Sequence, residues 1–166
     1  KGDKLVLSQT GSQREKGNFW LVYKYDALRR LVYTAEIDVK EATYEDYLQS
    51  FSGWYMRENF STGTINHPMS NTGYSRSFFH NNPTKLLTVN YYDSYKFLEL
   101  MSENVRNHMQ FSAFEDNDTC CAKGLLTGTR TYYLDGSGNY SETVYYYDYR
   151  GREIQRRSTN HLGGYD

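Results

Sequence analysis

The chain has 166 residues, of which 18 are Tyr and 8 are Phe, and its formal net charge is −1. A chain of this length can bury a core, and its apolar surface is largely aromatic, with rings that pack while a tyrosine hydroxyl stays in water. The basic residues are spread along the chain, which argues against a nucleic-acid surface, and no apolar run approaches the length that spans a bilayer.

The first part of the chain predicts a β-hairpin. Leu5–Leu7 is expected to be a short strand, and polar turn residues follow it. Phe19–Tyr25 and Leu31–Ile37 then alternate with the two-residue period of a strand. The alternation divides the first of these two strands into two partly apolar faces, with Phe19, Leu21, Tyr23 and Tyr25 on one and Trp20, Val22 and Lys24 on the other. Two such faces predict a sheet that is covered on both sides.

A change of period marks a helix after this hairpin. Aromatic and aliphatic residues recur at i, i+3, i+4 and i+7, the spacing of one helix face, at Tyr44, Tyr47, Leu48 and Phe51. Thr43 is a suitable N-cap and Gly53 a suitable stop. We expect one short helix here, packed on the sheet as part of an insertion over residues 43–85.

The remainder of that insertion, from Trp54 to Lys85, is expected to be a long loop. It is rich in Asn, Ser, Thr and Gly, contains both prolines and has no sustained period. Long loops without secondary structure are often functional. One interpretation is a ligand platform made by the aromatic residues of the loop, which are Trp54, Tyr55, Tyr74, Phe78 and Phe79. In a carbohydrate-binding module, the residues expected to stack on sugar rings are Trp20, Trp54 and Tyr55. The other interpretation, which we favour, is that the aromatic rings fix the loop to the sheet.

The second half of the chain predicts further strands. Leu86–Tyr92 is one of them, and the residues after Asp93 fit either a helical stripe or a continuing strand. Three more strands are expected to form a meander, with a Gly-rich turn at residues 135–139 between the first two. They are Thr129–Leu134, Tyr140–Tyr147 and Glu153–Arg157.

A short motif recurs at the ends of strands in this pattern. It is clearest in Tyr147-Asp148-Tyr149-Arg150-Gly151-Arg152, and weaker copies begin with Tyr25-Asp26 and Tyr92-Asp93. Asp at the first position of a turn and Gly at the fourth are preferences of a type I turn, and the Asp side chain can accept backbone N–H groups of its own turn. Arg29 and Lys96 stand where the weaker copies would have the glycine.

This motif resembles the YD repeat of Rhs proteins, which are large surface or secreted proteins of bacteria, and the flanking segments resemble the versions found in gut Bacteroidetes. The resemblance implies a mainly β fold, an antiparallel sheet of YD-repeat hairpins, and it favours a strand through Leu100. It also implies a location at the cell surface or outside the cell. The residues to which it gives a structural role in the repeat are Tyr25, Asp26, Tyr92, Asp93, Tyr147, Asp148, Gly151 and Arg152.

The same resemblance suggests a larger context for the chain. Gly2–Val6 and Tyr165-Asp166 look like parts of adjacent repeat units, so residues 1–166 are expected to be a single segment of a longer YD-repeat array. The implied partners are the remainder of the same polypeptide, namely neighbouring repeats and a cargo domain that the β-shell encloses.

No catalytic, cofactor or metal site is predicted. The four histidines, His67, His80, His108 and His161, lie in polar surroundings without the neighbours of a known catalytic signature. Cys120 and Cys121 are adjacent and match no metal-ligand spacing, so we expect two thiols. The sequence therefore predicts a structural protein without catalysis, and a carbohydrate-binding module is the alternative.

Overall fold

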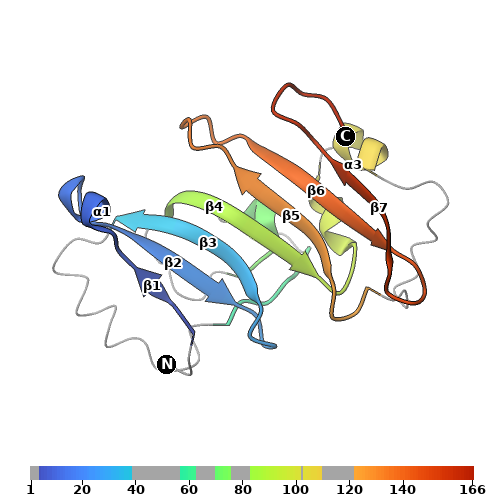
Figure 1. Ribbon diagram of the computed structural model, residues 1–166, viewed down its shortest axis with the longest axis horizontal. Coiled ribbons are helices and arrows are strands. Elements are labelled where there is room, and N and C mark those ends of the chain that lie inside the picture. Colours follow the sequence, from blue (N-terminus) through green and yellow to red (C-terminus); the bar gives the residue numbers. More distant parts are fainter. Residues whose placement is uncertain (1–3, 39–56, 63–69, 76–82, 102, 110–121) are drawn as a thin grey trace. The chain divides into compact units, whose positions relative to one another are not determined.

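The computed structural model describes residues 4–38, 57–62, 70–75, 83–101, 103–109 and 122–166. Its strands form one sheet of seven, hydrogen-bonded in the order in which they occur in the chain (Figure 1). The predicted class, mainly β with antiparallel strands, is confirmed. The chain divides into two compact units, Lys1–Ser61 with Tyr74–Thr88 and Thr62–Gly73 with Val89–Asp166, and we describe each by itself. No helix among the described residues is long and apolar enough to cross a membrane.

The first unit is built on the predicted hairpin. Strand β1 (Leu7–Ser8) pairs with β2 (Phe19–Tyr25), which pairs in turn with β3 (Leu31–Asp38), and both pairings are antiparallel. The observed β2 has the bounds that its alternation predicts. Strand β4 (Pro83–Tyr92) belongs to this unit as far as Thr88.

A short helix, α1 (Gly11–Glu15), lies where the sequence suggested only turn residues. Thr10 caps it, since its hydroxyl accepts the Gln13 backbone N–H at 3.3 Å and the Gln13 side chain accepts the Thr10 N–H at 2.9 Å. This reciprocal pair is a capping box. The pattern Thr-x-x-Gln was present in the sequence, but no apolar run follows it, so the usual helix signal was missing.

The core of the first unit is aliphatic and aromatic, with Val22, Val32, Tyr33, Ala35 and Ile37 all buried. The insertion adds a further ring to it. Tyr74 is 4% exposed, and its ring centroid lies 6.4 Å from that of Tyr33 and 5.4 Å from that of Phe60. This part of the long loop is therefore fixed to the sheet by aromatic packing, in agreement with the favoured interpretation.

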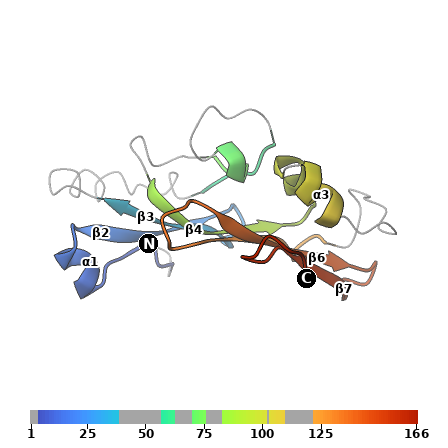
Figure 2. The same ribbon diagram turned by 90° about the horizontal axis from the view of Figure 1, so that it is seen from above.

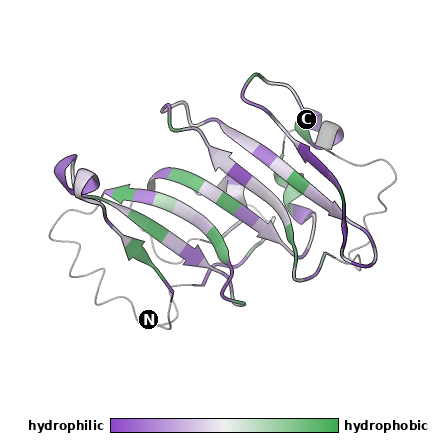
Figure 3. Cartoon of the chain, in the orientation of Figure 1, coloured by the Kyte–Doolittle hydropathy of each residue, from purple (hydrophilic) through white to green (hydrophobic). Residues whose placement is uncertain are grey.

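The second unit contains the predicted meander of β5 (Leu126–Tyr132), β6 (Tyr140–Tyr147) and β7 (Glu153–Ser158), with antiparallel pairing throughout. The described residues of this unit also form two 3-10 helices, η1 (Ser70–Thr72) and η2 (Lys96–Leu100), and helix α3 (Glu103–Met109). Figure 2 shows α3 on one side of β6 and β7. Figure 3 shows β7 as a largely hydrophilic strand.

The prediction of a strand from Asp93 through Leu100 is wrong, because the chain turns into η2 there. The helical turn directs two rings inward. Phe97 is 1% exposed and stacks on Tyr91, with ring centroids 4.4 Å apart. Tyr95 stacks on Tyr146 at 5.4 Å, and its hydroxyl donates to the Tyr145 carbonyl at 2.9 Å. The two-residue spacing of Tyr95 and Phe97 is also that of a strand, but here both rings are buried in the same core.

The Phe97 ring also explains a glycine in β5. A Cβ built on Gly128 would lie 2.3 Å from Cζ of Phe97, a distance that no side chain allows. Gly128 lies four residues after Gly124, the turn residue with positive φ. In the first unit, the residue four positions after the equivalent turn residue, Arg29, is Tyr33, which is buried. The second unit thus replaces a ring on the strand by a ring from η2.

The predicted helix at residues 43–53 lies outside the described residues, as do most of the long loop, both cysteines, His67 and His80.

Candidate functional site

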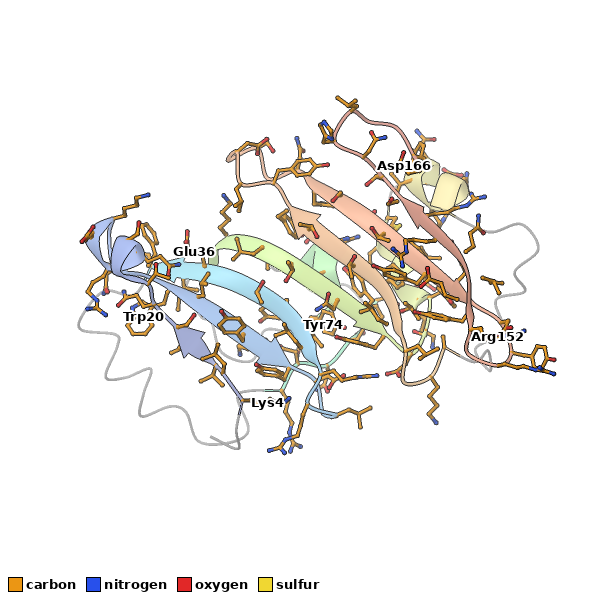
Figure 4. All side chains as sticks on the ribbon, viewed as in Figure 1. Lys4, Trp20, Glu36, Tyr74, Arg152 and Asp166 are labelled. Atoms are coloured by element: carbon orange, nitrogen blue, oxygen red, sulfur yellow. The ribbon has the colours of Figure 1, made fainter. Side chains whose placement is uncertain are left out.

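The hairpin between β6 and β7 has the geometry that its motif predicts. Gly151 has φ 73°, and its N–H donates to the Asp148 carbonyl at 2.9 Å. The Asp148 carboxylate accepts the backbone N–H groups of Arg150 and Arg152 at 2.8 and 2.9 Å. Its second oxygen forms an ion pair with the Arg152 guanidinium at 2.6 Å. The aspartate therefore closes its own turn, and Arg152, labelled in Figure 4, lies at the outer end of this hairpin.

The hairpin between β2 and β3 is the same turn without a glycine. Arg29 takes the positive φ, 65°, and donates its N–H to the Asp26 carbonyl at 3.0 Å. The Asp26 carboxylate accepts the Arg30 N–H at 2.9 Å and pairs with the Arg30 guanidinium at 2.7 Å. Arg29 thus departs from the motif in residue type but keeps the backbone geometry.

The third copy of the turn is split by an insertion. The Asp93 N–H donates to the Leu125 carbonyl at 3.1 Å, and the Asp93 carboxylate accepts the Gly124 N–H at 2.6 Å. Gly124 has φ 86°, and β5 begins two residues later, as β7 begins two residues after Gly151. The turn glycine of this copy is therefore Gly124, 31 residues after Asp93, and the alignment that placed Lys96 there is wrong.

A fourth turn of this kind follows β7, with Asn160 in the place of the aspartate. Gly163 has φ 82°, and its N–H donates to the Asn160 carbonyl at 3.1 Å. The Asn160 side-chain oxygen accepts the N–H groups of Leu162 and Gly164 at 3.1 and 2.9 Å. Tyr165-Asp166 then follows a turn, whereas the Tyr-Asp pairs of the other motifs end a strand.

A buried ion pair joins the sheet of the first unit to its insertion. Nζ of Lys24 lies 3.0 Å from Oε1 of Glu58, and the two side chains are 1% and 0% exposed. Tyr33 donates its hydroxyl to the same oxygen at 3.3 Å, and Ser75 donates its hydroxyl to Oε2 at 2.7 Å. Burial lowers the pKa of Lys24 although Glu58 acts in the opposite direction.

The second unit contains a comparable pair in Arg130 and Glu142, which lie directly opposite each other on β5 and β6. The Arg130 guanidinium donates to the Glu142 carboxylate and to the Asn71 carbonyl. Its carbon lies 5.0 Å from the centre of the Tyr140 ring and 5.6 Å from that of Tyr91, within the range of cation–π attraction.

The charges of this second cluster alter the ionisation of its members. Burial raises the pKa of Glu142 and Arg130 acts against it. Burial alone would lower the pKa of Arg130, but Tyr91 and Glu142 raise it above its usual value. Burial raises the pKa of Tyr132 to about 12 although Arg130 opposes the shift. Arg130 therefore acts on both neighbours in the same direction, since it opposes the rise in the pKa of Glu142 and of Tyr132 that burial causes.

Of the three proposed sugar-stacking residues, the structure describes only Trp20. Trp20, labelled in Figure 4, is half-buried on β2 opposite Ile37. Trp54 and Tyr55 lie outside the described residues. Of the histidines, His108 lies in α3 and His161 is exposed in the Asn160 turn. No group of three His, Cys, Asp or Glu side chains among the described residues could hold a metal ion.

Sequence reasoning missed three features of these sites, and two of them had a signal. Ala122-Lys123-Gly124-Leu125 completes the motif that Tyr92-Asp93 begins, although 28 residues separate the two parts. The turn at residues 135–139 fixes the register in which Arg130 faces Glu142. Glu58 had no signal, because it is one acidic residue in a polar loop.

Comparison of the chain with models of protein families, with curated proteins and with solved structures gives no significant match.

Proposed function

We propose that this chain is a structural segment of a larger Rhs-like protein of the bacterial cell surface or of the secreted fraction, without catalysis of its own. Its role is to supply YD-repeat hairpins to a β-shell that encloses a cargo domain of the same polypeptide. The observation that carries the proposal is the shared turn at Asp26, Asp93 and Asp148, where the aspartate side chain accepts backbone N–H groups across the turn.

The chemistry of the buried groups supports a structural role. Two carboxylates are buried among the described residues. Glu58 accepts from Lys24 and Ser75, and Glu142 accepts from Arg130. Side chains committed in this way position neighbouring segments and leave little capacity for a substrate. The half-buried Trp20 on β2 supports packing more than sugar stacking, which needs an exposed ring.

Location is tested on intact cells of the source bacterium. Antibodies raised against residues 1–166 should label unpermeabilised cells, or detect the protein in the medium. Labelling that requires permeabilisation would contradict the surface proposal.

The carbohydrate-binding alternative is tested with the purified chain on a glycan array. We expect no specific binding. A specific hit that is abolished by Trp20→Ala, Trp54→Ala or Tyr55→Ala, with the fold retained by circular dichroism, would establish a carbohydrate-binding module in place of a scaffold.

A further inference from the structure

The Lys24–Glu58 pair has the geometry of two groups held for condensation. The Nζ–Oε1 separation is 3.0 Å, and both side chains are removed from water. Charges in such a site are costly, so burial favours the neutral amine of Lys24 over its ammonium form. The lowered pKa of Lys24, caused first by burial, agrees with this direction.

The backbone fixes the glutamate beside the lysine. The Glu58 N–H donates to the Tyr25 carbonyl at 2.8 Å, and Arg57 forms a parallel bridge with Tyr25 at the end of β2. Lys24 is the residue before Tyr25 on the same strand. Two reacting groups positioned in this way have lost the freedom that normally slows a reaction between them.

Two hydroxyl groups are placed to assist at the carboxyl carbon. Ser75 donates to Oε2 at 2.7 Å, and its own oxygen accepts the Asn59 N–H at 2.8 Å, which orients the hydroxyl. A donor aimed at this oxygen would stabilise the negative charge of a tetrahedral intermediate. Tyr33 donates to Oε1 at 3.3 Å, so its hydroxyl can relay a proton from the nitrogen to the oxygen that leaves and end the step unchanged.

From this arrangement we propose that Lys24 and Glu58 form an intramolecular isopeptide bond, a covalent cross-link between β2 and the insertion. One proton passes from the Lys24 ammonium to the Glu58 carboxylate. The Nζ lone pair then attacks Cδ and the C–N bond forms. Oε1 leaves as water, carrying the transferred proton and a second proton from the nitrogen. The amide keeps one N–H, and no other reactant is consumed.

The cross-link would close a loop of 34 residues between Lys24 and Glu58. It replaces two buried charges by one neutral amide, which removes the desolvation cost of the ion pair. Like other covalent links, it would also restrict the unfolded chain. For a protein outside the cell, such a bond resists reducing agents, to which a disulfide is sensitive.

Mass spectrometry of the purified chain under denaturing conditions tests the proposal. We expect a mass lower by one water than the sequence mass. Asp135-Gly136 could also lose water, by cyclising to a succinimide. Tryptic mapping therefore identifies which residues have lost the water. Trypsin should fail to cleave after Lys24, and residues 17–29 should be recovered joined to residues 58–76. Separate peptides 17–24 and 58–76 in the folded wild-type protein would overturn the proposal.

Two variants distinguish a covalent cross-link from an ion pair. Lys24→Arg keeps the positive charge and makes the pair chemically similar to Arg130–Glu142. A guanidinium is not acylated by a carboxyl group, so this variant should have the full mass of its sequence. Ser75→Ala should slow the appearance of the cross-linked peptide after refolding at least tenfold. An equal rate in Ser75→Ala would remove the assisting role of that hydroxyl. The wild-type map decides the main question even if a variant does not fold.

Discussion

The carboxylate of Asp93 accepts the backbone N–H of Gly124 at 2.6 Å, although 31 residues separate the two in the chain. This contact closes a hairpin whose two halves are encoded on either side of η2 and α3. We expect Asp93→Ala to cost about 1–2 kcal/mol of unfolding free energy, comparable to the loss of a helix cap. Asp93→Asn should cost much less, because Asn tolerates the positive φ of 71° and keeps an acceptor oxygen.

Urea denaturation of both variants measures these differences. Asp38→Ala, at an exposed strand end, is the control and should change stability little. Equal losses in Asp93→Ala and Asp93→Asn would show that the side-chain oxygen is not what closes the turn.

The positive φ at the turn predicts opposite effects at two equivalent positions. Gly151→Ala should destabilise by about 1 kcal/mol, since a Cβ is strained at φ 73°. Arg29→Gly should be neutral or stabilising by up to about 1 kcal/mol, because Arg29 now bears that strain at φ 65°. Lys96→Gly should instead destabilise by up to about 1 kcal/mol, because Lys96 lies within η2. A lower Tm for Arg29→Gly than for Lys96→Gly would contradict the assignment of the turn position to Arg29 and not to Lys96.

The contact between Gly128 and Phe97 predicts a coupled pair. Gly128→Ala should cost about 1–3 kcal/mol, the usual cost of overpacking, because the new Cβ would meet the Phe97 ring. In Phe97→Leu the same Gly128→Ala change should cost less. A double-mutant cycle gives the coupling free energy, and Gly11→Ala, with nothing within 4 Å of its Cβ, is the matched control. Additive effects would mean that the ring moves away freely.

The Arg130–Glu142 pair predicts that one substitution is worse than two. Glu142→Gln leaves the buried guanidinium without its counter-charge, and we expect a loss of about 3–5 kcal/mol. The double variant Arg130→Met, Glu142→Leu should lose less, because no buried charge remains. Guanidinium chloride denaturation measures both. A double variant less stable than Glu142→Gln would show that the cation–π contacts with Tyr140 outweigh desolvation.

Asp148 predicts an acid-dependent contribution to stability. Hydrogen bonds from the Arg152 backbone, foremost among several causes, lower the pKa of Asp148 from 3.8 in the folded chain. Its contribution is therefore complete above the unfolded pKa and is lost as the pH falls from about 4 through the folded pKa. Asp148→Asn, which copies the natural Asn160 turn, should lack this part of the acid transition. If the free energy of unfolding falls equally with pH in wild type and in Asp148→Asn, the proposed contribution of Asp148 is contradicted.

Much of the fold could be predicted because local patterns and tertiary structure agree. The alternation of Phe19–Tyr25 and the hairpin signal before Tyr140–Tyr147 predicted both strands at their observed bounds. At Tyr95 and Phe97 the same reasoning failed. A two-residue spacing of rings is common to a strand and to a single 3-10 turn that buries both, and only the packing against Tyr91 and Tyr146 distinguishes them.

The buried pairs show a different limit of sequence reasoning. Arg130 and Glu142 could be matched through the register of their hairpin, since a turn between two strands sets which residues face each other. Lys24 and Glu58 could not, because no local rule connects a strand with a residue 34 positions later in an irregular segment. Contacts of that kind depend on the path of the whole insertion.

The divided turn at Asp93 and Gly124 also bears on how such a chain can diversify. The turn requires only an acceptor at its first position and a residue with positive φ near its end, and thirty residues stand between them here against two in the Asp148 turn. Four doublings of loop length cost roughly 2 kcal/mol in closure entropy. A hairpin tip of this type is therefore a site where new segments can be acquired, exchanged or lost during evolution while the strands on either side keep their register.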